Sequence, residues 1–238
     1  VTFATTGWGK LGNLEAVTRY FDSLGIPAAN VQAPMVAALE LVRGLLHAES
    51  LAAPATQVDE DAVDLDLDAA AFAGRGLLSS AACGVCGRVA IADLERRARE
   101  VTADTTLAPE ILAGLPAALR AAQPVFDETG GLHGAGLFTT AGVLVAARED
   151  VGRHNAVDKL VGWALDAGVA PAAHVIAVSG RLGYELVQKS VLFGAPIIVA
   201  VSAPSSLAID LAERFGICVA GFVRGTRFNL YAHAWRIR

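Results

Sequence analysis

The stretch that decides the fold runs from residue 175 to residue 223, VIAVSGRLGYELVQKSVLFGAPIIVAVSAPSSLAIDLAERFGICVAGFV. Three short apolar runs in it, residues 175–179, 197–202 and 217–223, have the length and β-branched content of buried strands. Between them, residues 183–193 and 205–215 have helical spacing and each ends at a glycine. Strands that alternate with helices predict an α/β fold with a mostly parallel sheet flanked by helices and right-handed crossovers.

The same alternation extends toward the N-terminus. Residues 137–140 and 143–147 are expected to form a hairpin, followed by a helix over residues 155–166. Residues 91–122 indicate one or two helices with a break at residues 114–116, where a Gly-Leu-Pro occurs. Further upstream we expect a helix over residues 34–47, a loop over residues 52–62 and a half-exposed strand over residues 62–68. The chain is therefore divided into a smaller N-terminal part, residues 1–76, and a main α/β domain, residues 77–238.

Composition excludes several classes of protein. The chain has 238 residues, of which 54% are hydrophobic and 18% charged, so it can bury a large core. Six of its 24 acidic residues lie within residues 59–68, and the remaining 18 nearly balance 19 basic residues. We therefore expect no nucleic-acid partner, which would need a broadly basic surface. No apolar run reaches membrane-spanning length and no signal peptide is visible, so we expect no membrane association and a cytoplasmic location.

Four arginines are predicted to meet at one edge of the sheet. Ligands of open α/β sheets bind beyond the carboxyl ends of the strands, and Arg153, Arg181, Arg224 and Arg227 follow four such ends. Helix N-termini arrive at the same edge with free N–H groups, and arginine forks suit phosphate oxygens. The pattern predicts a pocket for a polyanion, such as a nucleoside diphosphate. The alternative is that these arginines pair with the acidic residues Asp150, Asp158, Glu185 and Asp210.

A second candidate site is the pair of thiols in the small-residue stretch SSAACGVCG, residues 79–87. Cys83 and Cys86 form a CxxC, and four interpretations stay open on spacing alone. The pair fits a redox dithiol, part of a zinc site, a sulfur carrier that holds a persulfide, or two inert thiols. Cys218 lies in an apolar run and is expected in the core. Three cysteines in all do not suit a secreted disulfide scaffold.

One rival function comes from residues 47–49, His-Ala-Glu, upstream of the CxxC. Zinc deaminases of nucleosides and bases carry H-x-E followed by P-C-x-x-C. Here Ala82 stands where that signature has proline, which weakens the match. A zinc-dependent nucleoside or base deaminase is therefore the alternative, with His47 and Glu49 more readily explained as packing or surface residues.

Several motifs together resemble the formate dehydrogenase accessory sulfurtransferase (FdhD) family. The matching residues are CGVCG at 83–87, TGGLH at 129–133, EDVGRHNAVDK at 149–159, SGR at 179–181, VSAPSSL at 201–207, GFVR at 221–224 and NLY at 229–231. The resemblance covers about residues 77–233, and the EDVGRHNAVDK run is its most specific part. Residues 40–49 also look like a helix of the family, with Ser50 in place of its glycine. Residues 1–33 depart from the family pattern.

The resemblance implies a fold similar to cytidine deaminases, a homodimer, and a sulfur carrier with no bound metal of its own. The carrier would take persulfide sulfur from a cysteine desulfurase and pass it to the molybdenum bis(molybdopterin guanine dinucleotide) cofactor of formate dehydrogenase. Cys83 would hold the persulfide and Cys86 would assist. The position of the family's GDP-like nucleotide contact falls on Phe222, Val223, Arg224, Gly225, Thr226 and Arg227. Other expected contacts of the cofactor are His133, Arg153, His154, Ser179 and Arg181.

Overall fold

A computed structural model describes residues 2–4, 32–59, 62–66, 94 and 97–238. The helices are α2 (Gln32–Ala48), α5 (Pro109–Ala121), α6 (Pro124–Thr129), α7 (Arg153–Asp166), α8 (Tyr184–Phe193) and α9 (Ser206–Phe215), with the short 3-10 helices η2 (Pro171–Ala173) and η3 (Ala234–Arg236). The strands are β1 (Thr2–Ala4), β2 (Ala55–Asp59), β3 (Ala62–Leu65), β4 (His133–Thr139), β5 (Leu144–Asp150), β6 (His174–Val178), β7 (Ile197–Ala200), β8 (Cys218–Arg224) and β9 (Arg227–Ala232). None of the described helices is long and apolar enough to span a bilayer.

The main sheet is mixed, which corrects the expectation of a mostly parallel one. Its six strands lie in the order β5-β4-β6-β7-β8-β9, and only the β6–β7 and β7–β8 pairings are parallel. The β4–β5 and β8–β9 pairs are antiparallel hairpins, because each is joined by too short a turn for a parallel crossover. Strand β4 also lies antiparallel to β6, so it separates β5 from the parallel strands. Strand β5 consequently runs in the same direction as β6, β7 and β8.

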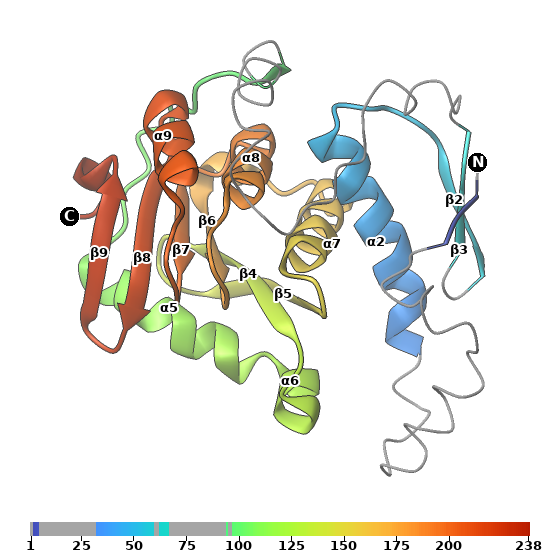
Figure 1. Cartoon of the computed structure of the whole chain (residues 1–238), viewed down its shortest axis with the longest axis horizontal. Coiled ribbons are helices and arrows are strands. Elements are labelled where there is room, and N and C mark those ends of the chain that lie inside the picture. The colour runs from blue at the N-terminus through green and yellow to red at the C-terminus, as the bar shows by residue number, and fades with distance from the viewer. Residues whose placement is uncertain (1, 5–31, 60–61, 67–93, 95–96) are drawn as a thin grey trace.

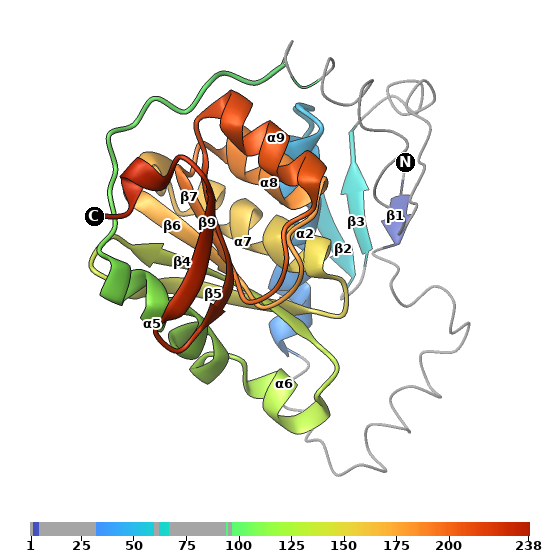
Figure 2. The same ribbon diagram turned by 60° about the vertical axis from the view of Figure 1, so that its left-hand side comes forward.

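Helices cover both faces of this sheet (Figures 1 and 2). Along β6, Val175 and Ala177 face α5, whereas Ile176 and Val178 face the layer that contains α7, α8 and α9. Helix α5 continues through Pro116, so the predicted break at residues 114–116 is wrong. Its buried Leu112, Leu115 and Leu119 lie on one face of the helix, and their burial offsets the lost backbone hydrogen bond at proline.

Helix α2 crosses α7 at unusually short range. A Cβ added to Gly162 of α7 would fall on the backbone of Glu40 in α2, and one added to Gly44 would fall on the backbone of Asp158. Beside this crossing, Glu40 receives two hydrogen bonds from Arg148 of β5, at 2.6 and 2.7 Å. The small sheet β1-β3-β2 lies beyond α2, with Val63 buried against it. Residues 55–59, expected in a loop, form the strand that pairs with β3.

Arg236 fixes the extended segment that leads into α5. This side chain is 1% exposed, and its guanidinium donates hydrogen bonds to the backbone carbonyls of Val101, Ala103, Thr105 and Gly216. The backbone of Leu107 also bonds to Arg236 and Arg238. Arg236, which lies far along the sequence, thus supplies hydrogen-bond donors to backbone carbonyls of residues 101–105, a described segment that pairs with no strand.

Candidate functional site

The carboxyl ends of four strands meet at one edge of the main sheet, as the sequence predicts. Since β5, β6, β7 and β8 run in one direction, the loops that follow them lie along the same edge. The starts of β4 and β9 reach this edge as well, because both strands run the opposite way. The expected cofactor contacts from His133 to Arg227 therefore share one rim of the molecule.

The run from Glu149 to Lys159 shows how the rim is built. Glu149 accepts hydrogen bonds from the backbone N–H groups of Val125 and Phe126, at 3.0 and 2.9 Å, and so holds the start of α6. Asp150 accepts from the backbone of Gly152 at 2.8 Å and forms a 2.6 Å ion pair with Lys159. These bonds fix the turn between β5 and α7, where Arg153 and His154 begin the helix.

Two ion pairs then join α7 to α8. His154 lies 3.0 Å from Glu185, and one turn further along both helices Asp158 lies 2.7 Å from Lys189. The hydrogen bond with His154 is the main reason why the pKa of Glu185 is lowered. On sequence alone, Glu185 is a candidate only as an arginine partner, and Lys189 does not stand out. The sequence signal that could have revealed both pairs is charge at i and i+4 on each helix, His154 and Asp158 on α7 and Glu185 and Lys189 on α8.

The four arginines of the rim have no carboxylate partner among the described residues. Three of the four acidic residues expected to pair with them, Asp150, Asp158 and Glu185, are engaged by Lys159, Lys189 and His154 instead. The alternative in which acids neutralise the arginines is therefore not the arrangement in this structure. Positive charge stays available for an anionic ligand.

His133, at the start of β4, lies close to Arg153 and within reach of the charge of Arg181. A Cβ on Gly180 would lie 3.1 Å from Nδ1 of His133 and 3.8 Å from Cδ of Arg153, so the three residues are close neighbours. Partial burial is the main cause that lowers the pKa of His133, and the positive charges of Arg153, Arg181 and His154 lower it further, against the opposing effect of Asp150. Ser179 accepts a 2.8 Å hydrogen bond from the backbone of Gly134, which ties β6 to β4 at this point.

The other half of the rim is the turn between β8 and β9. Arg224 and Arg227 face each other across Gly225 and Thr226, and Gly225 has a positive φ of 56° that suits a tight turn. Phe222 also has a positive φ, 53°, with its side chain exposed and its N–H bonded to Ser202. The side chain of Val223 is buried in the core under α5, so only its main chain is available to a ligand.

Of the three cysteines, the structure describes only Cys218. Cys83 and Cys86 lie outside the described residues. Cys218 is buried in β8, and burial raises the pKa of its thiol to about 12. It is therefore a neutral core residue at pH 7 and not a sulfur nucleophile.

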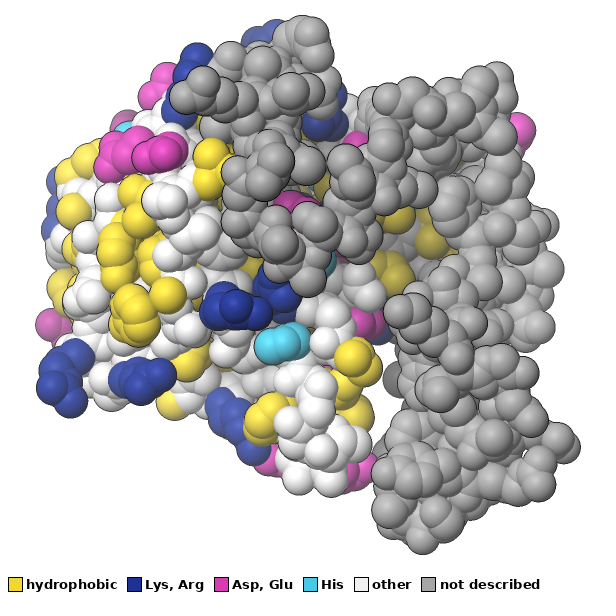
Figure 3. Space-filling model, in the orientation of Figure 1, with side chains coloured by type: hydrophobic (Ala, Val, Ile, Leu, Met, Phe, Trp, Pro, Cys, Tyr) yellow, Lys and Arg dark blue, Asp and Glu magenta, His cyan; other side chains and the backbone are white. Residues whose placement is uncertain are grey.

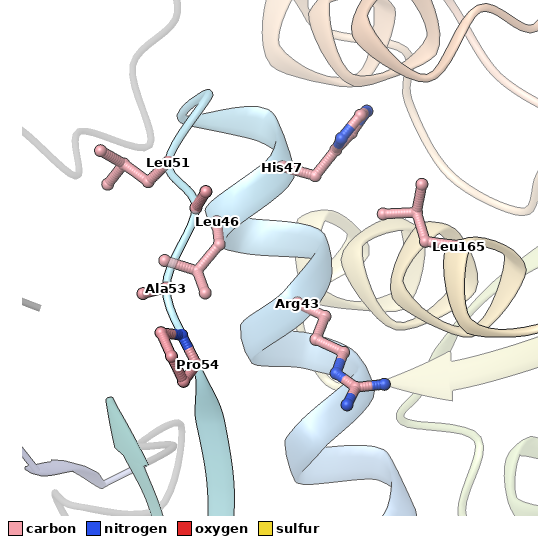
Figure 4. Close-up of a pocket in the computed structure, with 8 residues that line it drawn as sticks. Arg43, Leu46, His47, Leu51, Ala53, Pro54 and Leu165 are labelled. Atoms are coloured by element: carbon pink, nitrogen blue, oxygen red, sulfur yellow. The ribbon is translucent and has the colours of Figure 1, made fainter. Parts of the chain in front are cut away.

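A cavity of about 480 Å³ lies away from this rim (Figure 4). Its walls come from the end of α2, the following loop and Leu165 near the end of α7. They are mostly apolar, and the charge of Arg43 is paired with Asp166. His47 contacts the carbonyl of Leu192 at 3.0 Å through Nε2, and the described residues contain no cluster suited to a metal ion. Among the described residues, the sheet rim is therefore the candidate functional site.

Comparison with known proteins adds to this picture. The model of the FdhD/NarQ family matches residues 31–238, and a model of the DoxX family matches residues 1–54. A sulfur carrier protein FdhD from Nocardia farcinica is 53% identical over 167 residues, 69% of this chain and 60% of the relative. A sulfur carrier protein FdhD from Thermoplasma acidophilum is 43% identical over 229 residues, 91% of this chain and 81% of the relative.

A crystal structure of a protein described as a formate dehydrogenase accessory protein from Desulfotalea psychrophila has the same fold, with a TM-score of 0.66 and 24% identity. The alignment covers 84% of this chain and 79% of the other. The match to the relative from Nocardia farcinica spans about three fifths of that protein's length. The likeness to cytidine deaminases stays a prediction.

Proposed function

Because this chain belongs to the FdhD/NarQ family, we propose that it is a sulfur carrier that serves a formate dehydrogenase. The observation that carries the proposal is the identity with curated sulfur carriers, 53% in one relative and 43% over nearly the whole chain in another. The residues of the CxxC and of the sheet rim both fall within the matched range 31–238. The finer steps below are part of the same proposal.

The sulfur step needs only thiol chemistry. The Cys83 thiolate attacks the outer sulfur of a persulfide on a cysteine desulfurase, the donor's S–S bond breaks, and the donor cysteine leaves as a thiolate. Cys83 then carries the persulfide, with no net oxidation or reduction. Attack of the Cys86 thiolate on the inner sulfur of Cys83 would form a disulfide and release sulfide to the acceptor. The two thiols supply the two electrons that reduce the outer (sulfane) sulfur to sulfide. A cellular dithiol reductant then returns the Cys83–Cys86 disulfide to two thiols.

The acceptor in this proposal is the molybdenum bis(molybdopterin guanine dinucleotide) cofactor, handled as cargo. Its guanine nucleotide would dock at the rim, where Phe222 is exposed beside Arg224 and Arg227. What supports this assignment is the set of arginines without carboxylate partners in the described part of the chain. Guanidinium groups bind phosphate oxygens through paired hydrogen bonds, and an exposed aromatic ring offers a face to a base. A homodimer, with one rim on each subunit, belongs to the same proposal.

The test is intact mass after incubation with a cysteine desulfurase and cysteine. The wild type is expected to gain about 32 Da, one sulfur, and to lose it on reduction. Cys83→Ala should gain none. Cys218→Ala is the matched control, because its buried neutral thiol should leave the gain unchanged. Metal content is read on the same sample. No sulfur gain together with one zinc per chain would overturn the proposal and favour the deaminase.

A further inference from the structure

The positive side chains of the rim form two groups rather than one. The first, which we name the β4–β6 cluster, consists of His133, Arg153 and Arg181. The second, the hairpin pair, consists of Arg224 and Arg227. Figure 3 shows basic side chains beside a histidine near the centre of the face and others apart from them at the lower left, below the ends of β8 and β9 in Figure 1.

The order of the strands sets the separation. Arg181 follows β6 and Arg224 ends β8, with β7 between them. Neighbouring strands lie about 4.8 Å apart, so the two strand ends are about 10 Å apart, and the outer strands β5 and β9 about 24 Å apart. The loop after β7, Ser202 to Ser206, lies between the groups and carries no charge. A single phosphate in one group therefore leaves the other group unneutralised.

The arginines of the β4–β6 cluster form no ion pair with a carboxylate among the described residues, and Glu185, on which the charge of Arg153 acts, is paired with His154. A Cβ at Gly180 would lie 3.1 Å from Nδ1 of His133 and 3.8 Å from Cδ of Arg153, so the glycine leaves room for both side chains at the end of β6. The Nε atom of Arg153 is buried and has no hydrogen-bond partner among the described residues. Partial burial is the largest cause of the lowered pKa of His133, and repulsion by Arg153 and Arg181 lowers it further. Asp150 opposes this shift in the pKa of His133, and it is already paired with Lys159.

Two helix N-termini add to the same cluster. Helix α7 begins after Gly152 and helix α8 after Gly183, and neither has a side-chain cap. In α9, by contrast, the N-cap Ser205 accepts a hydrogen bond from Ala208 at 3.2 Å. Carboxylates also lie at both uncapped starts, since Asp150 accepts from Gly152 and Glu185 lies in the first turn of α8. The partial positive charge of a helix N-terminus favours an anion there.

We propose that the β4–β6 cluster is a phosphate site of its own, separate from the nucleotide site at the hairpin pair, so that one chain holds two phosphate-bearing groups at once. The ligand class is a phosphate or diphosphate ester. The natural ligand rests on the proposed function, since the cofactor in that proposal carries more than one phosphate group. The existence of the site does not rest on it, because the cluster would bind free phosphate whatever the cargo.

The test uses inorganic phosphate and GDP as separate probes, by titration calorimetry at one fixed ionic strength. In the wild type, phosphate should still bind when GDP is saturating. The double variant Arg153→Ala/Arg181→Ala should weaken phosphate binding about tenfold or more and change GDP binding less than about threefold, because removal of one charge-assisted hydrogen bond weakens a ligand by roughly tenfold. The double variant Arg224→Ala/Arg227→Ala should show the reverse. Arg120→Ala, an exposed arginine of α5 outside both groups, is the control.

The outcomes separate the two proposals. Competition between phosphate and GDP, or equal weakening of both ligands by both double variants, would mean a single site and would overturn the inference. Absence of phosphate binding in the wild type would do the same. Phosphate binding without GDP binding would keep the inference and contradict the nucleotide part of the proposed function. Melting temperatures within about 2 °C of wild type would show that the variants are folded.

Discussion

Replacing Gly162 with alanine should destabilise the protein, although alanine is the better helix former. The new Cβ would lie on the carbonyl group of Glu40, only 2.7 Å from its carbon, where ordinary contact begins at about 3.4 Å. The obstacle is backbone of α2, which cannot rotate away as a side chain can. Helices α2 and α7 would have to separate, and the bidentate contact of Glu40 with Arg148 would be disturbed as well.

The size of the effect follows from two opposing contributions. Overpacking of a tight contact costs about 1–3 kcal/mol, and a rigid backbone neighbour places this contact in the upper part of that range. Glycine to alanine in a helix interior returns about 1 kcal/mol. The net loss is about 1–2 kcal/mol, which lowers the melting temperature by about 2–8 °C in a domain of this size.

The assay is thermal unfolding followed by far-ultraviolet circular dichroism, with Gly114→Ala as the matched control. Gly114 lies inside α5, is exposed, and has no atom within 4 Å of an added Cβ. The same substitution there should raise the melting temperature by about 1–4 °C, because only the helix propensity changes. If Gly162→Ala proves as stable as wild type, or shifts in the same direction as Gly114→Ala, the close crossing of α2 and α7 does not exist in solution.

Three further predictions concern buried charge. Glu40→Gln leaves the guanidinium of Arg148 without its carboxylate and should lower the free energy of unfolding in urea by about 2–4 kcal/mol. The double variant Glu40→Met/Arg148→Met should lose less, because no charge is left unpaired. A loss under about 0.5 kcal/mol for Glu40→Gln would contradict the prediction. The lowered pKa of His133 means that the unfolded chain takes up this proton first, so stability should fall as pH drops below about 6.5, and His133→Gln should flatten that fall. Equal pH profiles for both proteins would refute the assignment. Arg236→Lys should release the segment at Val101 to trypsin or amide exchange, because one ammonium cannot reach four carbonyls, and unchanged protection there would show that the guanidinium is dispensable.

The core elements of the fold could be predicted from local patterns. Helices α8 and α9 begin and end within one residue of the expected positions, since each ends at a left-handed glycine and α9 has a serine cap. The direction of the strands could not be predicted in the same way. Strand β4 lies between β5 and β6 in the sheet, although β5 and α7 separate it from β6 in the sequence. No local sequence pattern indicates this placement. Local signals also predict a break in α5 at Pro116, because the buried face that keeps this helix continuous is a tertiary contact.

The candidate site could likewise be predicted from the sequence only in part. The convergence of Arg153, Arg181, Arg224 and Arg227 on one edge could be predicted, because β5 keeps the direction of the parallel strands despite the inserted β4. Which charges are paired could not be predicted from sequence. Asp158 and Lys189 are 31 residues apart, and only the packing of α7 on α8 brings them together. The two-group layout of the rim likewise depends on the order of the strands in the sheet.

The carbonyl contacts of Arg236 have a consequence for synthesis. Val101, Ala103 and Thr105 precede Arg236 by 131 to 135 residues. At a translation rate of about 5–20 residues per second, these carbonyls leave the ribosome roughly 7–27 s before the side chain that binds them. The segment that follows the CxxC in the sequence is therefore fixed only after the strands from β4 to β9 have emerged.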